Sequence, residues 1–416
     1  MSRKTLNIGL FGFGCVGQGL YEVLEKTPTL NARIHRICVK DPNKQRSIAP
    51  EHFTFNPDDI LTDPQINTVV ELIDDADAAY KLVCKALKAG KSVVSANKKM
   101  IAEHFEELIQ LQKETGSALL YEAAVCASIP IIRNLEEYYD NDLLELIEGI
   151  VNGSTNYILT RTDKDKISPQ QALQQAQALG YAESNPIMDV GGFDAKFKLV
   201  LLLGHAFGAL VDPEEIFHLG IDRLGKLELD YAKEKSLKVK LVAVAKRHDN
   251  GKISALVMPK FVSPDDPLFG VDDVFNGVKT KTHFSDAQFF AGRGAGAYPT
   301  ASAVISDISA LSYDYKYEYK KRQFLTPATL NQRVAVKVLF RYQDLLQSFV
   351  VEQFISVSET FHSESESYII GTIDTDRLKR LLDNPLDQAS AVLFQVQDDA
   401  ILEQQTQKFK YSTLLN

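Results

Sequence analysis

The chain has 416 residues, of which 45% are apolar and 24% charged, a composition typical of globular proteins with two or three domains. Its 46 basic and 55 acidic residues give a net charge of −9, which argues against nucleic acid as the main partner. No run approaches the ~18–20 apolar residues of a membrane span, and the first residues lack the apolar core of a signal peptide. We therefore expect a cytoplasmic protein without a membrane partner.

Apolar runs at residues 7–11, 34–39, 68–73, 92–95 and 118–121 predict strands, and the segments 16–24, 77–88 and 103–115 predict the helices between them. Strands that alternate with helices predict an α/β fold with a Rossmann-type, doubly wound parallel sheet. We place this domain at residues 1–125, completed by a helix around residues 300–322.

A glycine-rich turn follows the first strand and precedes a helix; its residues are Gly12, Phe13, Gly14, Cys15, Val16 and Gly17. In this setting the GxGxxG spacing indicates dinucleotide binding, because the glycines let the backbone approach a diphosphate at the helix N-terminus. After the second strand, Lys40 and Asp41 give a divided signal. An acid there would bind a ribose hydroxyl of NAD, whereas a cation would bind the 2′-phosphate of NADP, so the preference stays open.

Two further polar segments follow strands of this sheet, at the edge where ligands of such folds bind. Residues 95–99 contain Ser95 and Lys98, which could reach a cofactor or substrate, although a solvated lysine pair is the simpler interpretation. Residues 121–130 form the second segment. Four cysteines (Cys15, Cys38, Cys84 and Cys126) lack metal-ligand spacing and are expected to be reduced, mostly buried thiols.

From about residue 126 the pattern becomes mixed, and we assign a second, α+β domain to residues 126–300. Ser168 begins a capping box that predicts a helix ending at Gly180, and Asp212-Pro213-Glu214-Glu215 resembles another helix start. A glycine-rich loop with Gly292 and Gly294 precedes an apolar helix at 301–311. Strands at 253–258 and 331–341 and a helix at 374–382 follow, so residues 327–416 are expected to form a small α+β region.

The most informative segment runs from Asp189 through Gly191-Gly192 to Asp194 and Lys198, just before an apolar helix. Residues four apart share one face of a helix, so Asp194 and Lys198 can converge on one small polar ligand. A surface ion pair worth a few tenths of a kcal/mol is the alternative for an isolated pair of this kind. Asn152, Gly153 and Thr155 form a polar turn that could bind a carboxylate or an amine, or simply turn the chain.

Taken together, these segments resemble the monofunctional homoserine dehydrogenase family over roughly residues 6–320. The resemblance is carried by GFGCVG, GKSVVSANKK, YEAAVCASIP, VNGSTNYIL, MDVGGFDAKFKL and GRGAGAYPTASA in that order. It implies reversible hydride transfer between L-aspartate 4-semialdehyde and L-homoserine with NADP or NAD, in threonine, methionine and isoleucine biosynthesis. It also implies a homodimer or homotetramer whose second domain binds the amino-acid substrate and contributes to dimerisation.

The resemblance also implies roles for individual residues. Lys198 would be the catalytic acid and base, with Lys98 contacting cofactor and substrate and Asp194 completing the catalytic set. Asp194, Glu183 and Asp189 would bind the substrate with Asn152, Gly153 and Thr155. The cofactor would contact the Gly12–Gly17 turn, Lys40, Asp74, Ser95, Lys98, Gly292 and Gly294. A monovalent cation (Na⁺ or K⁺) would be held by backbone carbonyls of Glu122, Val125, Ala127 and Ile129.

Several departures from the family pattern and two alternatives remain. Asp74-Asp75 replaces the common double glycine, and Cys126-Ala127-Ser128 replaces a glycine-rich run beside the cation site. The region after residue 327 lacks a clear effector loop and reads as a divergent ACT-like domain. A reductase for another amino-acid semialdehyde or ketone, or a cofactor-binding sensor without catalysis, are the competing hypotheses. The division of acid–base work between Lys198 and Lys98 stays open.

Overall fold

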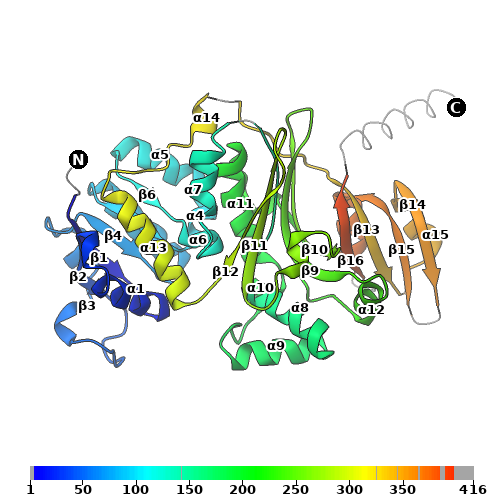
Figure 1. Ribbon diagram of the computed structural model, residues 1–416, viewed down its shortest axis with the longest axis horizontal. Coiled ribbons are helices and arrows are strands. Elements are labelled where there is room, and N and C mark those ends of the chain that lie inside the picture. The colour runs from blue at the N-terminus through cyan, green and yellow to red at the C-terminus, as the bar shows by residue number, and fades with distance from the viewer. Residues whose placement is uncertain are drawn as a thin grey trace. The chain divides into compact units, whose positions relative to one another are not determined.

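The structure is a computed structural model that describes residues 4–141, 143–324, 326–343, 345–363, 366–384 and 389–397. These residues form two compact units. Unit 1 takes in the described residues within 1–142, 200–213 and 291–326, and unit 2 those within 143–199, 214–290 and 327–416. Figure 1 shows both units in ribbon form.

Unit 1 contains a parallel six-stranded sheet in the order β3-β2-β1-β4-β5-β6. This is the strand order of the Rossmann fold, so the predicted doubly wound sheet is confirmed. The central strands are almost completely buried, as a sheet covered by helices on both sides requires. The strands are β1 (Leu6–Phe11), β2 (Ala32–Cys38), β3 (Phe53–Thr54), β4 (Thr68–Glu71), β5 (Ser92–Ser95) and β6 (Leu119–Leu120).

Helices of unit 1 pack against its sheet, and α13 lies beside α1 (Figure 1). A Cβ atom at Gly19 would lie only 3.0 Å from the Ala297 carbonyl oxygen, so α1 and α13 approach one another at a position without a side chain. The helices are α1 (Cys15–Glu25), α2 (Asp58–Leu61), α3 (Ala76–Lys88), α4 (Lys98–Glu103), α5 (Phe105–Thr115), α6 (Ala123–Cys126), α7 (Ile131–Arg133), α13 (Ala297–Leu311) and α14 (Lys320–Phe324).

Unit 2 is built on a ten-stranded mixed sheet in the described chain, with β12-β11-β7-β9-β10-β16-β13-β15-β14 in order and β8 beside β10. The first half comprises β7 (Leu144–Ile150), β8 (Phe217–His218), β9 (Lys238–Arg247), β10 (Ile253–Val262), β11 (Phe275–Thr282) and β12 (Gln288–Arg293). Its helices are α8 (Gly153–Asp165), α9 (Pro169–Ala178), α10 (Ile187–Val190), α11 (Phe193–Phe207), which continues into unit 1, and α12 (Lys226–Glu234).

The C-terminal module, defined here as residues 335–396, has the order strand, helix, strand, strand, helix, strand. Its antiparallel strands lie in the order β16-β13-β15-β14, which is the ferredoxin-like arrangement. β16 pairs in parallel with β10, so the module extends the sheet of unit 2 (Figure 1). Its elements are β13 (Ala335–Tyr342), α15 (Gln347–Gln353), β14 (Ser356–His362), β15 (Ser367–Asp374), α16 (Thr375–Leu382) and β16 (Ser390–Val396). The predicted region after residue 397 lies outside the described residues.

The local signals predicted the capping box at Ser168 correctly and the helix start at Asp212 wrongly. The capping box at Ser168 is present, with Ser168 and Gln171 bonding reciprocally. The helix expected from Asp212 is wrong: only a short 3₁₀ turn forms at Pro213–Glu215, because the chain then enters β8 and pairs with β10. The helix expected from about Glu103 to Thr115 forms as α5, which begins at Phe105 and ends at Thr115. In the part of the chain described, no helix is long and apolar enough to cross a membrane.

Candidate active site

The glycine turn after β1 has the geometry that a diphosphate requires. Gly12 has φ +95°, and a Cβ there would lie 2.5 Å from the Leu72 carbonyl oxygen; a Cβ at Gly17 would lie 2.5 Å from the Gly12 carbonyl oxygen. A Cβ at Gly14 would meet no protein atom within 4 Å. Gly14 is also the N-cap of α1 and has no capping side chain, so the first amide groups of the helix face this open space.

The other residues of this turn lie either in the core or at the surface. Phe13 is buried and packs edge-on against Tyr21 and Phe53, with ring centroids 6.1 and 5.2 Å apart. Cys15 is exposed and Val16 is half-buried. The cysteines form no disulfide among the described residues, and because Cys15 is exposed and Cys84 only partly buried, burial is less general than expected.

The loop after β2 is richer in cations than the sequence analysis recognised. Lys40 and Asp41 are both exposed, and the Asp41 carboxylate accepts a hydrogen bond of 2.8 Å from the Asn43 amide. The Arg46 guanidinium donates to the Asp41 and Lys44 carbonyls and lies 5.0 Å from the centre of the Phe53 ring. The sequence did not indicate Arg46, because it follows the end of β2 by eight residues and only the folded loop brings its guanidinium back to the Asp41 carbonyl.

Behind the next two strand ends lies a buried polar network. The Glu71 carboxylate accepts from the Ser95 hydroxyl at 2.5 Å and from the Ile73 amide at 2.7 Å. Asn97 donates to the Ile73 carbonyl and caps α4 by accepting from the Met100 amide. Burial raises the pKa of Glu71 to about 7. Ser95 therefore helps to hold the loop after β4 and the loop after β5 in fixed positions relative to one another.

Two other predicted residues lie on the loops that this network fixes. Lys98 is the first residue of α4 and half-buried, while Asp74 is exposed beside the N-cap of α3. Both stand at the carboxyl edge of the parallel sheet, where ligands of such folds bind.

In unit 2 the Asp194–Lys198 pair is buried, so the surface-pair interpretation is wrong. Lys198 Nζ lies 2.8 Å from Asp194 Oδ2 and donates to the Val151 carbonyl at 2.7 Å. Asp194 is 5% exposed and Lys198 is 8% exposed. Asn152 Nδ2 donates to both Asp189 Oδ1 and Asp194 Oδ2, each at 2.8 Å. One amide thus joins two carboxylates that are five residues apart.

The turn at the start of α8 sets this amide in place. Asn152 is the N-cap of α8, and its Oδ1 accepts from the amide and the hydroxyl of Thr155. Because both donors occupy Oδ1, Nδ2 is directed at the two aspartates. A Cβ at Gly153 would lie 3.0 Å from the Val274 carbonyl oxygen, so glycine permits a close backbone approach there. Glu183 lies apart from these contacts in the described chain: it is exposed in the turn after α9, where its carbonyl accepts from Gln177.

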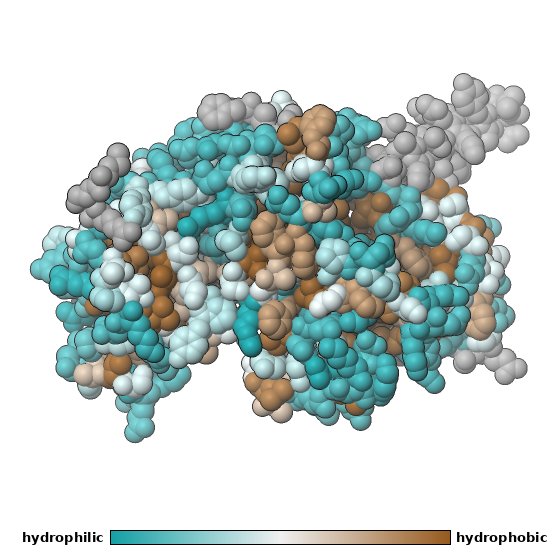
Figure 2. Space-filling model, viewed as in Figure 1, coloured by the Kyte–Doolittle hydropathy of each residue, from teal (hydrophilic) through white to brown (hydrophobic). Residues whose placement is uncertain are grey.

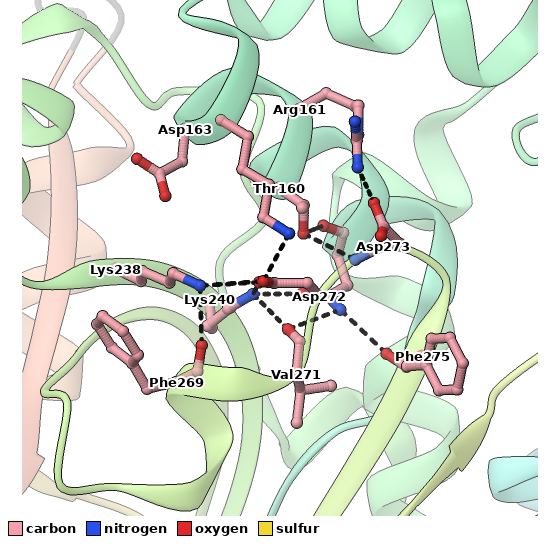
Figure 3. Close-up of polar contacts among 12 residues, drawn as sticks. Thr160, Arg161, Asp163, Lys238, Lys240, Phe269, Val271, Asp272, Asp273 and Phe275 are labelled. Carbon is pink, nitrogen blue, oxygen red and sulfur yellow. Dashed lines mark hydrogen bonds and ion pairs between the residues drawn. The ribbon is translucent and has the colours of Figure 1, made fainter.

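A second charged cluster fixes α8 against the sheet (Figure 3). Asp272 lies 3.0 Å from Lys238 Nζ and 3.1 Å from Lys240 Nζ, and it also contacts Lys164 of α8. Lys240 is almost fully buried, and burial lowers its pKa to about 8, whereas the lysines around Asp272 hold the pKa of that carboxyl near 2. The cluster ties α8 to β9 and to the loop before β11, and thereby supports Asn152 at the start of the helix.

The segment predicted to hold a cation forms a tight loop in unit 1. The Glu122 carboxylate is buried and accepts from the Ile132 and Arg133 amides at 2.8 and 2.9 Å. Its own amide donates to Asp307, whose carboxylate pairs with Arg133 at 2.8 Å. Burial raises the pKa of Glu122 to about 7 and that of Asp307 to about 6. Among the described residues no cluster of three or more His, Cys, Asp or Glu could hold a metal.

The backbone of this loop is unusual at Ala127, which has φ +43° without being glycine. The Ile129 carbonyl accepts from the Ile131 amide at 2.8 Å, and Val125 is buried on α6. Gly292 lies against the same loop, since a Cβ there would be 2.7 Å from the Ser128 hydroxyl. Gly294 is half-buried in the loop that leads into α13.

Two cavities of the described chain are not lined by these groups. Cavities of about 530 and 730 Å³ both lie on unit 2 around Leu224 and Gly225, away from Lys198 and Asp194. The structure therefore gives a candidate region in each unit, the glycine turn in unit 1 and the buried charges around Asp194 and Lys198 in unit 2.

Comparison with known proteins points to one family. The model described as homoserine dehydrogenase matches residues 130–309, and the model described as homoserine dehydrogenase, NAD binding domain, matches residues 12–122. A homoserine dehydrogenase of Bacillus subtilis is 33% identical over 333 residues, which is 78% of this chain and 77% of the relative. One from Synechocystis is 37% identical over 314 residues, 73% of this chain and 72% of the relative.

Solved structures agree. A homoserine dehydrogenase from Thiobacillus denitrificans has a TM-score of 0.82 at 28% identity and covers 95% of this chain and 99% of its own. A hyperthermophilic archaeal homoserine dehydrogenase in complex with NADPH has a TM-score of 0.65 at 28% identity, and covers 76% of this chain and 99% of its own.

Proposed function

The chain belongs to the homoserine dehydrogenase family, and on that premise we propose how its residues divide the work of the reaction. It is an oxidoreductase that acts on the CH–OH group of homoserine with a nicotinamide cofactor. The observation that carries our assignment is the buried Asp194–Lys198 pair, whose shared amide partner, Asn152, also holds Asp189.

Lys198 is assigned the proton transfer. The bound cofactor supplies or accepts the hydride at the carbon that bears the oxygen. When the aldehyde is reduced, negative charge develops on its oxygen, and the Lys198 ammonium both stabilises that charge and supplies the proton. In the reverse direction the Lys198 amine accepts the hydroxyl proton. Asp194, at 2.8 Å, orients Nζ and balances its charge. Lys98 is assigned contacts with cofactor and reacting substrate.

The acids of unit 2 are assigned to the ammonium group of the amino-acid substrate. Asp189 and Asp194 present carboxylates that the Asn152 amide fixes, and we assign to Glu183, which is exposed in the turn after α9, the role of a third carboxylate. Thr155 and Gly153 act through the position of Asn152. A substrate with an amino group is thereby favoured over a simple hydroxy acid.

For the cofactor we assign NADP in preference to NAD. The open space at Gly14 and the uncapped start of α1 fit a diphosphate, with Gly12 and Gly17 required by the fold of the turn. Lys40 and Arg46 offer cations for a 2′-phosphate, while the Asp41 carboxylate is engaged by the Asn43 amide. The archaeal relative crystallised with NADPH is in keeping with this assignment.

A monovalent cation, Na⁺ or K⁺, is assigned to the backbone carbonyls of Glu122, Val125, Ala127 and Ile129. The unusual backbone of Ala127, with φ +43° in a buried loop, is the observation that supports this assignment. A cation there would hold the loop that contacts Gly292. We further propose a cytoplasmic homodimer or homotetramer, as the family resemblance implies.

The assignment is tested by following reduced nicotinamide by absorbance with L-homoserine and either NADP⁺ or NAD⁺. We expect faster turnover with NADP⁺. 4-Hydroxybutyrate, which lacks the amino group, should show KM raised at least tenfold, since a charge-assisted hydrogen bond is worth about 1.5–3 kcal/mol. Equal kinetic constants for the two alcohols would refute the role of the three acids.

A further inference from the structure

The turn that carries Asp189 packs directly on a loop formed by residues 219–225. The Ile221 amide donates to the Val190 carbonyl at 2.7 Å, and a Cβ at Gly220 would lie 2.0 Å from the Val190 oxygen and 2.5 Å from Gly191 Cα. Backbone therefore meets backbone without an intervening side chain. Because neither chain segment can yield by a change of rotamer, a displacement of the loop is passed to the turn.

The C-terminal module also forms hydrogen bonds with this loop. Arg341 of β13 donates through Nη2 to the Arg223 carbonyl at 3.1 Å, and Arg223 donates to the Leu382 carbonyl, at the end of α16, at 2.6 Å. Three segments of unit 2 thus meet at residues 223–225: the loop, β13 and α16.

A buried ion pair lies at the centre of this junction. Arg341 Nε lies 2.6 Å from Glu228 Oε1, and the Gly225 amide donates to Glu228 Oε2 at 2.9 Å. The Ser390 hydroxyl, at the start of β16, donates to the same carboxylate. Glu228 is 0% exposed, although its helix α12 presents mainly hydrophilic side chains outward (Figure 2).

The chemistry of this junction favours a geometric role. A buried ion pair contributes little more to stability than apolar residues of the same volume would, because both charges lose their hydration. Three directional hydrogen bonds to one carboxylate do, however, fix the position of each donor. Here the donors belong to the loop, to β13 and to β16, so the carboxylate fixes the loop relative to the module.

We propose that Glu228, Arg341 and the loop 219–225 are positioning elements for Asp189, through which the C-terminal module sets the affinity for the amino-acid substrate. In this proposal they act through the position of Asp189 and not by contact with substrate or cofactor. The inference rests on the proposed binding of the substrate ammonium by Asp189 and Asp194. It predicts a specific kinetic signature: substrate affinity depends on the junction, whereas cofactor affinity does not.

The test compares the full chain with the double variant Arg341→Met/Glu228→Gln, which removes both charges together. KM for homoserine should rise about tenfold, since misplacing a binding group by ~1 Å can cost up to ~10²-fold, while kcat and KM for NADP⁺ stay within about threefold. The control is Lys279→Met/Asp266→Asn, a partly buried pair 2.6 Å apart that joins β11 of the same sheet to the turn before it; the change also removes one of the cations beside the buried Glu148. It should lose comparable stability to urea without a change in KM. An equal rise in KM in the control, or an unchanged KM in the junction variant, overturns the proposal.

Two milder changes keep the test decisive where the double variant does not fold. Arg341→Lys keeps the ion pair but not the bond to the Arg223 carbonyl, and it should show an intermediate KM. Gly220→Ala should raise KM for homoserine, whereas Gly270→Ala, whose Cβ would meet nothing within 4 Å, should not. Asp194→Asn distinguishes failure of this inference from failure of the proposed function. If Asp194→Asn raises KM for homoserine but the junction variants do not, only this inference fails. If Asp194→Asn leaves KM and kcat normal, the proposed roles of the acids fail.

Discussion

Replacing Lys198 by methionine tests the centre of the proposed site, because it removes the ammonium and keeps most of the side-chain volume. Lys198 makes two contacts, with Asp194 Oδ2 at 2.8 Å and with the Val151 carbonyl at 2.7 Å. After the change Asp194 keeps only the hydrogen bond from Asn152 among these contacts. A carboxylate that is 5% exposed then lacks its cationic partner.

The cost to stability can be estimated from that geometry. Removing one member of a buried pair typically costs about 3–5 kcal/mol, because the other charge stays buried. We expect about 3 kcal/mol for Lys198→Met, since Asn152 still donates to Asp194. The double variant Lys198→Met/Asp194→Asn removes both charges and should recover all but about 1 kcal/mol.

Catalysis should respond differently from stability. Loss of a positioned acid and base lowers kcat by ~10²–10⁴-fold, and this loss should persist in the double variant although its stability returns. Urea denaturation measures the first quantity, and the absorbance of reduced nicotinamide with homoserine measures the second. NADPH affinity, measured by fluorescence titration, should stay near normal. Recovery of kcat in the double variant, or an equal loss of NADPH affinity and turnover, would refute the role of Lys198.

Three further predictions concern unit 1. Gly12→Ala should destabilise the fold by about 2 kcal/mol or more, because the φ of Gly12 is +95° and a Cβ there would meet the Leu72 carbonyl; thermal unfolding measures this loss. Gly14→Ala should fold normally and weaken NADPH binding at least about tenfold, which a binding titration measures. Arg46→Ala should weaken NADP⁺ binding about tenfold or more and leave NAD⁺ binding unchanged, since one charge-assisted bond to the 2′-phosphate is lost; equal losses for both cofactors would contradict this. The pKa of Glu71 in the folded chain, about 7, lies above the usual glutamate value of 4.5, so the stability that protonated Glu71 contributes is fully present below pH 4.5 and is lost as pH rises through 7. Relative to wild type, the stability of Glu71→Gln should therefore rise by roughly 3 kcal/mol between pH 4.5 and pH 8 in urea titrations.

The sequence was most informative where structure follows from local backbone sterics. The GxGxxG turn and the alternation of strands and helices predicted the parallel sheet, because glycine geometry and strand burial are local properties. The Asp194–Lys198 contact followed from helical spacing alone. Family resemblance, carried by several motifs in order, then identified the activity.

Long-range contacts lay beyond such reasoning. Asn152 lies 37 and 42 residues from the two aspartates it joins, and Arg133 pairs with Asp307 across 174 residues. Both arrangements depend on how distant elements pack, and no local pattern encodes them. The failed helix at Asp212 shows the same limit, because pairing of β8 with β10 overrode a sound capping signal.

The hydrogen-bond capacity of Asn152 constrains how the site can work. Its Oδ1 is committed to the Thr155 amide and hydroxyl, and its Nδ2 protons are committed to Asp189 and Asp194. An asparagine amide has only two donor protons, so it contributes no further donor to a ligand. Asn152 therefore acts on the substrate only through the two carboxylates, which bind the ammonium group in our proposal. Replacing Asn152 by aspartate would set three carboxylates together, and should harm substrate affinity more than the neutral change to alanine, because like charges repel in a buried site.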